Sequence, residues 1–358
     1  MSLKLQFVKC IFCVILYLLT CLLFLQLKAK LNLIEHIYIE KNNKIKEIDL
    51  SSTMFAYNKK SVNSNIKLLQ YNKVKLESSY LQENGSLLKQ ISNTCVKYNL
   101  RTPLVKKHFL YSSKHKSLYC WIRKVASTTF TTLFSNIQEH RNMNSLTPHS
   151  SKELEHLTND SNVFKLLVVR HPFERLVSSY RDRIEDNTKY TDQAWIYTKK
   201  IYHLTRPNLF RSNKTTSSFF QRIFTRDKRL QIVPTFKEFV EWLLQESPEH
   251  DDVHWNQYYT HCALCNINYN FILKLDHYTF DQINYIFSKF GIDKDNMNLP
   301  NLEQSKGGCT DFKMTCKYFQ NLTHNTILKL HERYKIDFEM YNYDLDKYLL
   351  CKSGITKI

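Results

Sequence analysis

Twice along this chain, a short run of β-type residues leads into a basic turn and then into a segment with helical apolar spacing. The first copy joins an expected strand at residues 117–122 to an expected helix at 128–138 through a turn that contains Lys124. The second runs from the apolar strand at 163–169 into RHPFERLVSSYRDRI, where Pro172 suits a first helical turn. Alternating strands and helices predict an α/β fold with a mostly parallel sheet flanked by helices.

Later segments continue the alternation. The stretch TFKEFVEWLLQES begins with a capping-box pattern, in which Glu238 follows Thr235 by three residues, and it keeps its apolar residues on one helical face. NFILKL, residues 270–275, has the apolar run of another buried strand. The helix expected after it ends at Gly291.

Each of the two basic turns combines the features of an anion site. A strand that feeds a helix directs backbone N–H groups and the positive end of the helix dipole at one point. In the first turn, Lys124 adds a mobile charge, and the hydroxyls at 127–129 can donate hydrogen bonds. In the second, Arg170 can form a bidentate fork, and Ser178 lies two helical turns further on. Two such turns on neighbouring strands could hold two separate phosphates of one nucleotide. The first turn lacks the G-x-x-x-x-G-K-[ST] pattern of nucleoside triphosphatases, so ATP hydrolysis is not the default prediction.

Near the N-terminus, residues 10–27 form an 18-residue run without a charge. This length is close to the minimum for a bilayer span. We predict a cytoplasmic tail at 1–9, a transmembrane signal anchor at 10–27 and a lumenal stem at 28–94. A cleaved signal peptide or a buried core helix is the alternative for the apolar run, and a helical subdomain is the alternative for the stem.

Four Asn-x-Ser/Thr sequons follow the apolar run, as a lumenal body requires, at Asn84, Asn159, Asn213 and Asn321. Cysteines also continue beyond it, and an oxidising lumen would allow disulfides among them with an odd one left over. The Cys262-x-x-Cys265 pair is compatible with redox activity, with a zinc site that includes Cys309 and Cys316, or with structural disulfides. We favour structural disulfides, with their partners undetermined.

Lys and Arg number 51 against 33 Asp and Glu, which gives a formal net charge of +18. Such a charge favours polyanionic partners, namely nucleic acid, anionic lipid or acidic polysaccharide. The apolar span and the sequons argue against nucleic acid. The basic stretch at 205–229 is interpreted either as a solvated loop or as a wall for an anionic acceptor.

Four segments, between about residues 95 and 349, resemble one protein family. RKVASTTF resembles the P-K-V-A-C-T-N-W element that binds the 5′-phosphosulfate of 3′-phosphoadenosine 5′-phosphosulfate (PAPS) in Golgi carbohydrate sulfotransferases of the HNK-1 and chondroitin 4-O type, sulfotransferase family 2. RHPFERLVSSYRDR is similar to the family's R-x-P-F-E-R-L-V-S-A-Y-R-x-K element, which binds the 3′-phosphate. VHWNQYYTHCALC resembles its H-W and C-x-x-C segment, and YKIDFEMYNY resembles its C-terminal Y-x-x-D-F-x-x-F-x-Y signature.

The resemblance implies a P-loop-like sulfotransferase fold over residues 95–358, PAPS as the sulfate donor and no metal. It implies that the first element lines the phosphosulfate and the second holds the 3′-phosphate. The residues carried over are Arg123, Lys124, Val125, Ala126, Ser127, Thr128 and Thr129, then Arg170, His171, Pro172, Phe173, Glu174, Arg175, Leu176, Val177 and Ser178. Arg123 and Thr129 stand where the family has Pro and Asn.

Two catalytic roles follow from the same resemblance. Lys124 would stabilise charge on the leaving phosphate as the sulfuryl group moves in line to a sugar hydroxyl. His254, at the family's His-Trp position, is the candidate general base, and the neighbouring Asp251 and Asp252 are acidic substitutes for it.

The prediction is therefore a single-pass type II Golgi enzyme with a lumenal catalytic domain, which transfers sulfate from PAPS to an acidic glycan. The favoured acceptor is the 4-hydroxyl of N-acetylgalactosamine in chondroitin or dermatan. One alternative is an enzyme for terminal N-acetylgalactosamine or glucuronic acid of glycoproteins. Another is a sulfotransferase-like glycan-binding protein that has lost turnover through the changes at Arg123 and Thr129. The sequence leaves the oligomeric state open.

Overall fold

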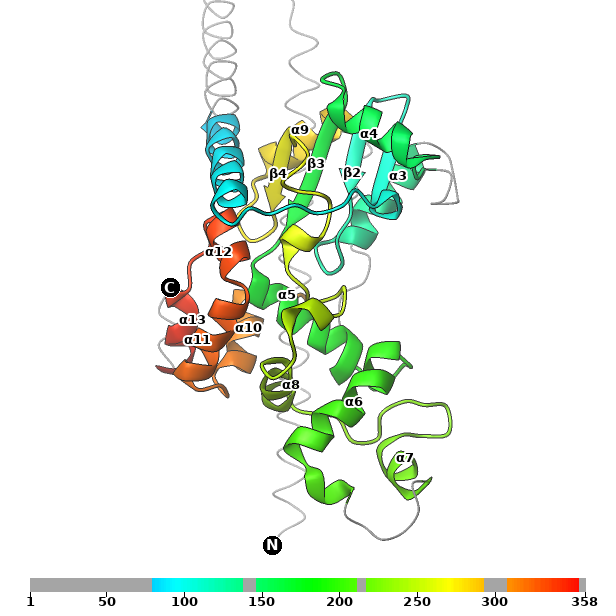
Figure 1. Cartoon of the computed structure of the whole chain (residues 1–358), viewed down its shortest axis with the longest axis vertical. Helices are drawn as coiled ribbons and strands as arrows, with labels where there is room; N and C mark the ends of the chain where they lie inside the picture. The colour runs from blue at the N-terminus through cyan, green and yellow to red at the C-terminus, as the bar shows by residue number, and fades with distance from the viewer. Residues whose placement is uncertain (1–78, 138–145, 211–216, 293–307, 354–358) are drawn as a thin grey trace, which may run out of the picture. The chain divides into compact units, whose positions relative to one another are not determined.

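A four-stranded sheet forms the centre of the computed structural model, which describes residues 79–137, 146–210, 217–292 and 308–353 (Figure 1). The strands, in sheet order, are β1 Phe109–Ser112, β2 Ser117–Cys120, β3 Phe164–Val169 and β4 Phe271–Lys274. Strands β2, β3 and β4 are parallel, and β1 is antiparallel to β2. The predicted α/β class with a mostly parallel sheet is confirmed. The antiparallel edge strand β1 was not predicted.

Helices flank the sheet and fill the remainder of the described chain. Residues 79–97 are helical, and the further α-helices are α3 Ser127–Ile137, α4 Ser151–Asn159, α5 Pro172–Tyr180, α6 Asp192–Thr205, α7 Ser217–Ile223, α8 Phe236–Leu243, α9 Phe280–Phe290, α10 Phe312–Phe319, α11 His324–Arg333, α12 Lys335–Tyr341 and α13 Asp346–Leu349. A π-helical turn, Arg181–Glu185, continues α5. The Thr235–Glu238 capping box begins α8 as predicted, and α9 ends at Gly291, whose φ of 67° is left-handed.

Within the described residues, the buried apolar side chains form two clusters. The first surrounds the sheet, where Phe134 of α3 and Phe290 of α9 meet with their ring centroids 4.7 Å apart. The second lies among the helices below the sheet in Figure 1 and includes Phe173 and Val177 of α5 and Phe239 of α8. Helix α5 thus continues from the central strand into the helical cluster, which fixes the direction in which it leaves the sheet.

The expected anchor at 10–27 lies outside the described residues, as do the expected tail and most of the expected stem. Within the described ranges, no helix has the length and hydropathy needed to cross a bilayer. The expected boundary between stem and catalytic domain, at residue 95, falls inside the helix at 79–97. Tyr80 and Ile91 of this helix belong to the core around the sheet, so the folded domain begins at or before residue 79.

The side chain of Asn84 joins this helix to the outer edge of β4, the last strand of the sheet. Its side-chain amide donates to the carbonyl of Ile272 at 2.7 Å and accepts from the N–H of the same residue at 3.3 Å. Strand β4 is an edge strand, so the amide supplies the two bonds that a neighbouring strand would otherwise make. The Asn84 sequon is buried, and a glycan at this position is incompatible with the packing. The sequons at Asn159 and Asn321 are exposed, and Asn213 lies outside the described residues.

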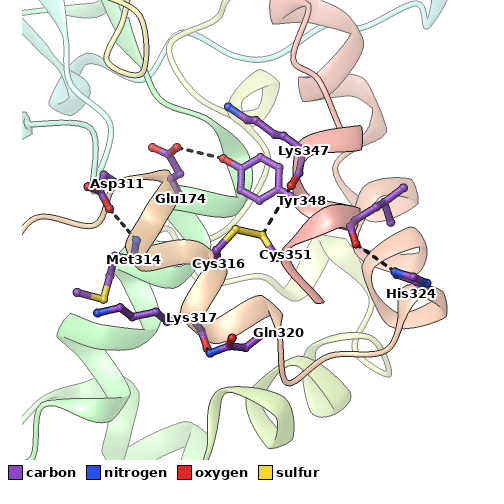
Figure 2. The surroundings of a disulfide bond; sticks show 11 residues. Glu174, Asp311, Met314, Cys316, Lys317, Gln320, His324, Lys347, Tyr348 and Cys351 are labelled. Carbon is purple, nitrogen blue, oxygen red and sulfur yellow. Dashed lines mark hydrogen bonds between the residues drawn. A yellow bond between two sulfur atoms is a disulfide. The ribbon is translucent and has the colours of Figure 1, made fainter. Parts of the chain in front are cut away.

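Three disulfides connect segments that are distant in the sequence. Cys95–Cys265 joins the helix at 79–97 to the loop before β4, and Cys120–Cys262 joins the end of β2 to the same loop. Cys316–Cys351 joins α10 to the turn after α13 (Figure 2). The predicted structural role of Cys262 and Cys265 is confirmed, and each pairs with a different partner rather than with a metal. Cys309 is exposed and is not disulfide-bonded.

We predict that Asn84→Ala lowers the free energy of unfolding by about 1–3 kcal/mol, because it leaves the Ile272 N–H and carbonyl without partners in a buried position. Chemical denaturation of protein made without N-glycans measures the change. Asn321→Ala, which also removes a sequon but from an exposed turn, is the matched control and should change stability by less than about 0.5 kcal/mol. Equal effects of the two substitutions would contradict the edge-pairing role of Asn84.

Candidate active site

The two basic turns lie side by side at one edge of the sheet. Strands β2 and β3 are adjacent and parallel, so their carboxyl ends, which lead into α3 and α5, meet at the same edge. Two contacts join the turns directly. The ammonium nitrogen of Lys124 lies 3.1 Å from Oδ2 of Asp182, which follows α5, and Nε of Arg175 donates to the carbonyl of Arg123 at 3.0 Å.

The first turn bends through two non-glycine residues in the left-handed region. Lys124 has a φ of 68° and Ala126 a φ of 56°, and between them Val125 is fully buried in the core. This conformation is sparsely populated by residues with a Cβ and is found preferentially at functional sites. The side chain of Val125 anchors the turn in the core. The turn leads directly into α3, of which Ser127 is the first helical residue.

Asp182 gathers three cations at the mouth of this turn. Besides Lys124, its carboxylate contacts Nε of Arg183 at 2.8 Å and Nζ of Lys189 at 2.7 Å. Burial alone would raise the pKa of Asp182, but the charges of Lys124 and Arg183 and a hydrogen bond from Lys189 lower this pKa to about 2. Asp182 is therefore ionised at every physiological pH, and it holds Lys124 in an ion pair in which both side chains are mostly buried.

The second turn holds Arg170 through a relay of side chains. Nε of Arg170 lies 3.4 Å from a carboxylate oxygen of Glu174, and the other oxygen of Glu174 accepts from the hydroxyl of Tyr348 at 3.0 Å. Figure 2 shows Tyr348 directed at Glu174, close to the Cys316–Cys351 bridge. Burial raises the pKa of Glu174, and the nearby charge of Arg170 opposes this rise. The disulfide therefore supports the residue that aligns the Arg170 guanidinium.

Many of the predicted cofactor-binding residues are scaffold residues. The side chains of Phe173, Leu176 and Val177 lie in the helical core, and His171 caps α5 by accepting the N–H of Phe173 at 3.2 Å. Partly exposed side chains are the ones that can reach a ligand. The predicted residues with a partly or fully exposed surface are Arg123, Lys124, Ala126, Ser127, Thr128, Thr129 and Arg170, whereas Val125, His171, Pro172, Phe173, Glu174, Arg175, Leu176, Val177 and Ser178 are buried.

Arg175 differs most from its expected role. Its guanidinium is 2% exposed and donates to three main-chain carbonyls: that of Arg123 at 3.0 Å, that of Val253 at 3.0 Å and that of Asn256. The group also lies 4.8 Å from the ring centroid of Tyr258. With these donors engaged, Arg175 joins the first turn to the loop of the candidate base and does not face a phosphate.

That loop presents His254 as a buried, oriented imidazole. Its Nδ1 lies 2.5 Å from Oδ1 of Asp252, and its Nε2 has no hydrogen-bond partner among the described residues. Burial lowers the pKa of His254, while the Asp252 carboxylate raises it and the charges of Arg183 and Arg123 lower it further. The imidazole is therefore neutral at neutral pH. Because Nδ1 faces the carboxylate, its proton stays there, and Nε2 is left as the acceptor.

The two neighbouring aspartates have separate functions. Asp252 orients His254 rather than replacing it. Asp251 forms a buried ion pair with Arg333 at 2.6 Å, on the side of the loop that faces α11. The expectation that either could serve as a substitute base is not supported by these contacts, because both carboxylates are engaged.

Three cations of the basic stretch at 205–229 have partners within the described residues. Nε and Nη2 of Arg206 donate to Glu238 at 2.5 and 2.8 Å, and Nε of Arg229 pairs with Asp227 at 2.5 Å. Lys228 lies over the ring of Trp195 at 5.2 Å. These partners favour the structural interpretation for the three cations. Arg211 and Lys214 lie outside the described residues.

Residues 107–344 match the sulfotransferase family. The chain belongs to this family. This span contains both basic turns, the Asp252–His254 pair and the C-terminal signature. The matched region therefore includes the site described above.

The similar proteins are carbohydrate sulfotransferases. This sulfotransferase is 28% identical to carbohydrate sulfotransferase 11 of Mus musculus over 313 residues, which cover 78% of this chain and 81% of the relative. It is 26% identical to carbohydrate sulfotransferase 10 of Mus musculus over 74% of this chain and 76% of the relative. It is 27% identical to carbohydrate sulfotransferase 9 of Homo sapiens over 64% of this chain and 52% of the relative. No solved structure gives a significant match.

Sequence reasoning about this sulfotransferase missed the residues that hold its site together. Asp182 follows Ser178 by four residues. This spacing is typical of one helical face, and it is the signal that could have identified Asp182. Tyr258 gave no comparable signal. Its hydroxyl accepts the N–H of Arg170 at 3.1 Å and donates to the carbonyl of the same residue at 2.8 Å. That contact depends on a fold in which residues far apart in the sequence become neighbours.

We predict that Arg175→Lys destabilises the sulfotransferase by at least about 2 kcal/mol, because one ammonium cannot reach three divergent carbonyls and leaves buried acceptors unpaired. Chemical denaturation gives the change in unfolding free energy. Arg229→Lys is the matched control, since the Arg229–Asp227 pair is exposed, and it should cost less than about 0.5 kcal/mol. A near-neutral Arg175→Lys would refute the scaffold assignment.

Proposed function

We propose that this sulfotransferase transfers sulfate from PAPS to a hydroxyl of an acidic glycan, with the 4-hydroxyl of N-acetylgalactosamine in chondroitin or dermatan as the favoured acceptor. The observation that carries the proposal is the meeting of two cationic turns with a neutral, oriented imidazole. Lys124 and Arg170 come from neighbouring strands, and the charges of Arg123 and Arg183 act on His254. One site thus combines donor contacts with a proton acceptor.

The residues present fit a nucleotide with phosphate groups at two positions. The left-handed turn at Lys124 and the N-terminus of α3 suit a phosphosulfate, and Arg170 at the end of β3 suits a separate 3′-phosphate. PAPS, when bound, supplies the sulfuryl group and a phosphate as the leaving group. Ser178 lies within α5 and is buried, so Arg170 is the partly exposed side chain of the second element.

Two side chains of the chain then have chemical roles. Nε2 of His254 accepts the proton of the acceptor hydroxyl as the hydroxyl oxygen forms the new bond to sulfur. The Nδ1–H group of His254 stays hydrogen-bonded to Asp252. Lys124 counters the charge that develops on the phosphate oxygen as its bond to sulfur breaks. The proton ends on His254 and the bonding pair on the phosphate, which balances the transfer. To reach the leaving group, Lys124 exchanges the Asp182 carboxylate for the ligand.

Charge and similarity support an acidic acceptor. The formal net charge of +18 favours a polyanion, and the names of the similar proteins describe carbohydrate sulfotransferases. We further propose that the apolar run at 10–27 anchors the chain in the Golgi membrane with this domain in the lumen. The three disulfides of the described chain suit an oxidising compartment.

Full-length protein in detergent, incubated with labelled PAPS and desulfated chondroitin, dermatan, heparan and N-glycan acceptors, tests the function. Linkage analysis of the labelled product identifies the position of the sulfate. Transfer to chondroitin or dermatan at the 4-position is the expected result. Transfer only to terminal N-acetylgalactosamine or glucuronic acid would support the glycoprotein alternative. Donor binding without any transfer would support the non-catalytic alternative.

We predict that Lys124→Ala lowers the rate of transfer by at least about 100-fold, because it removes the charge that stabilises the leaving phosphate. Initial rates at saturating donor and acceptor measure the effect, and thermal unfolding checks the fold. Lys189→Ala removes the other lysine that pairs with Asp182 and should keep most of the activity. If Lys124→Ala and Lys189→Ala lose equal activity, the assigned role of Lys124 is wrong.

We predict that transfer declines in acid, below the usual His pKa of about 6.5, because protonation of His254 removes the acceptor lone pair and burial sets its folded pKa below that value. Asp252→Asn should move this acid limb to still lower pH, since the carboxylate raises the pKa of His254, and should also lower the plateau rate. The pH profile of kcat for both proteins measures the shift. An acid limb at the same pH in both would contradict the Asp252–His254 pairing.

A further inference from the structure

A small cavity lies against the first basic turn, on the side that the mechanism does not use. It has a volume of about 190 Å³ and is lined by Lys107, His108, Trp121, Ile122, Arg123, Val253 and His261. Ligand pockets that enclose whole nucleotides or drug-sized molecules have volumes of about 300–1,000 Å³. This cavity is therefore suited to a single ring.

The cavity is continuous with the catalytic residues. Arg123 belongs to the donor turn, and Val253 directly precedes His254. Arg123 also lines the cavity, and its charge lowers the pKa of both His254 and His108. The main chain on both sides is fixed, because Arg175 donates to the carbonyls of Arg123 and Val253. The cavity wall therefore includes the residue that directly precedes the candidate base.

Three uncharged rings, those of Trp121, His108 and His261, form part of the cavity wall. The rings of Trp121 and His108 lie 5.0 Å apart, and those of His108 and His261 lie 5.5 Å apart. Burial lowers the pKa of His108 to about 4 and that of His261 to about 3, so both imidazoles are neutral at physiological pH. Nδ1 of His108 is buried and has no hydrogen-bond partner in the described part of the chain.

Trp121 is held in place but keeps an accessible face. Its Nε1 donates to the carbonyl of Lys107 at 3.1 Å, and the residue is only partly buried. The other tryptophans differ, because Trp242 and Trp255 are buried in the core and Trp195 lies against Phe220 and Phe224. An indole fixed at the mouth of a one-ring cavity offers an apolar surface to the C–H face of a pyranose. Exposed Lys107 and Arg123 at the rim can pair with a carboxylate.

We propose that this cavity is an acceptor subsite, which binds the acidic sugar next to the one that receives sulfate. The pyranose ring lies on Trp121, and its carboxylate faces Lys107 and Arg123. This inference deepens the proposed function and rests on it, since it names the uronic acid unit beside the reacting sugar as the recognised feature. It also explains why an exposed arginine stands at position 123 beside an indole, 5.5 Å from its ring centroid.

Binding and transfer are measured separately to test the subsite. Full-length protein in detergent, saturated with adenosine 3′,5′-bisphosphate, is titrated by calorimetry with a chondroitin hexasaccharide, with its carboxyl-reduced form and with a single N-acetylgalactosamine glycoside. Trp121→Ala is compared with Trp121→Phe, which keeps an aromatic face, and with Phe280→Ala, which removes a 69% exposed ring elsewhere. Lys107→Ala tests the rim.

We predict that Trp121→Ala weakens hexasaccharide binding by about 10-fold or more, while Trp121→Phe stays within about 3-fold of the natural protein and Phe280→Ala has no effect. The affinities for the bisphosphate and for the single glycoside should not change with Trp121→Ala. Lys107→Ala should remove the preference for the hexasaccharide over its carboxyl-reduced form.

Hexasaccharide binding that is absent, or that is unchanged by Trp121→Ala, overturns the subsite. Trp121-dependent binding by a protein that transfers no sulfate keeps the subsite and refutes the proposed function. The two failures are therefore distinguishable in one set of measurements.

Discussion

The buried guanidinium of Arg175 is the contact on which the site depends. From the middle of α5, it donates hydrogen bonds to carbonyls of the first turn and of the loop that carries His254. Without it, three carbonyls in partly buried positions would lose their donor, and a buried carbonyl left unpaired costs about 1–3 kcal/mol. The same group therefore stabilises the fold and sets the relative position of the donor turn and the base. Ser179, four residues further along α5, donates a hydrogen bond to the carbonyl of His254 at 2.6 Å.

The C-terminal signature supports the site indirectly, through Trp255 and Tyr258. The hydroxyl of Tyr334 donates to the carbonyl of Trp255 at 2.6 Å, and buried Asp337 accepts the N–H of Tyr258 at 2.9 Å. Tyr258 in turn brackets the main chain of Arg170. A carboxylate buried this deeply is costly, and burial raises the pKa of Asp337 to about 7. Its position explains why this segment contains an aspartate between aromatic residues although none of them reaches the ligand side.

Sequence reasoning found the three parallel strands, the helices after them and the two turns, because those features are local: apolar runs, caps and a proline at a helix start. It could not divide the RHPFERLVS element into ligand-facing and core-facing residues. Arg170 lies just before α5 and is partly exposed, whereas Arg175 lies within α5 and is buried. The partners of Arg175 lie more than fifty residues away in either direction, so no local pattern separates the two arginines. Asn84 shows the same limit, since a sequon and an edge-pairing amide have the same local sequence and differ only by the strand that lies beside them.

Asp182 shows how the free site handles its own charge. An unpaired ammonium beside Arg183 and Lys189 would be destabilised by like charges in a partly dry region, and the carboxylate offsets this by pairing with all three cations. A ligand that takes Lys124 must therefore compete with an ionised carboxylate 3.1 Å away. A doubly charged phosphate meets that requirement better than a neutral or singly charged group, because its attraction to the cluster of cations is larger. The ion pair thus biases the turn toward polyanionic donors without any change in the residues that contact them.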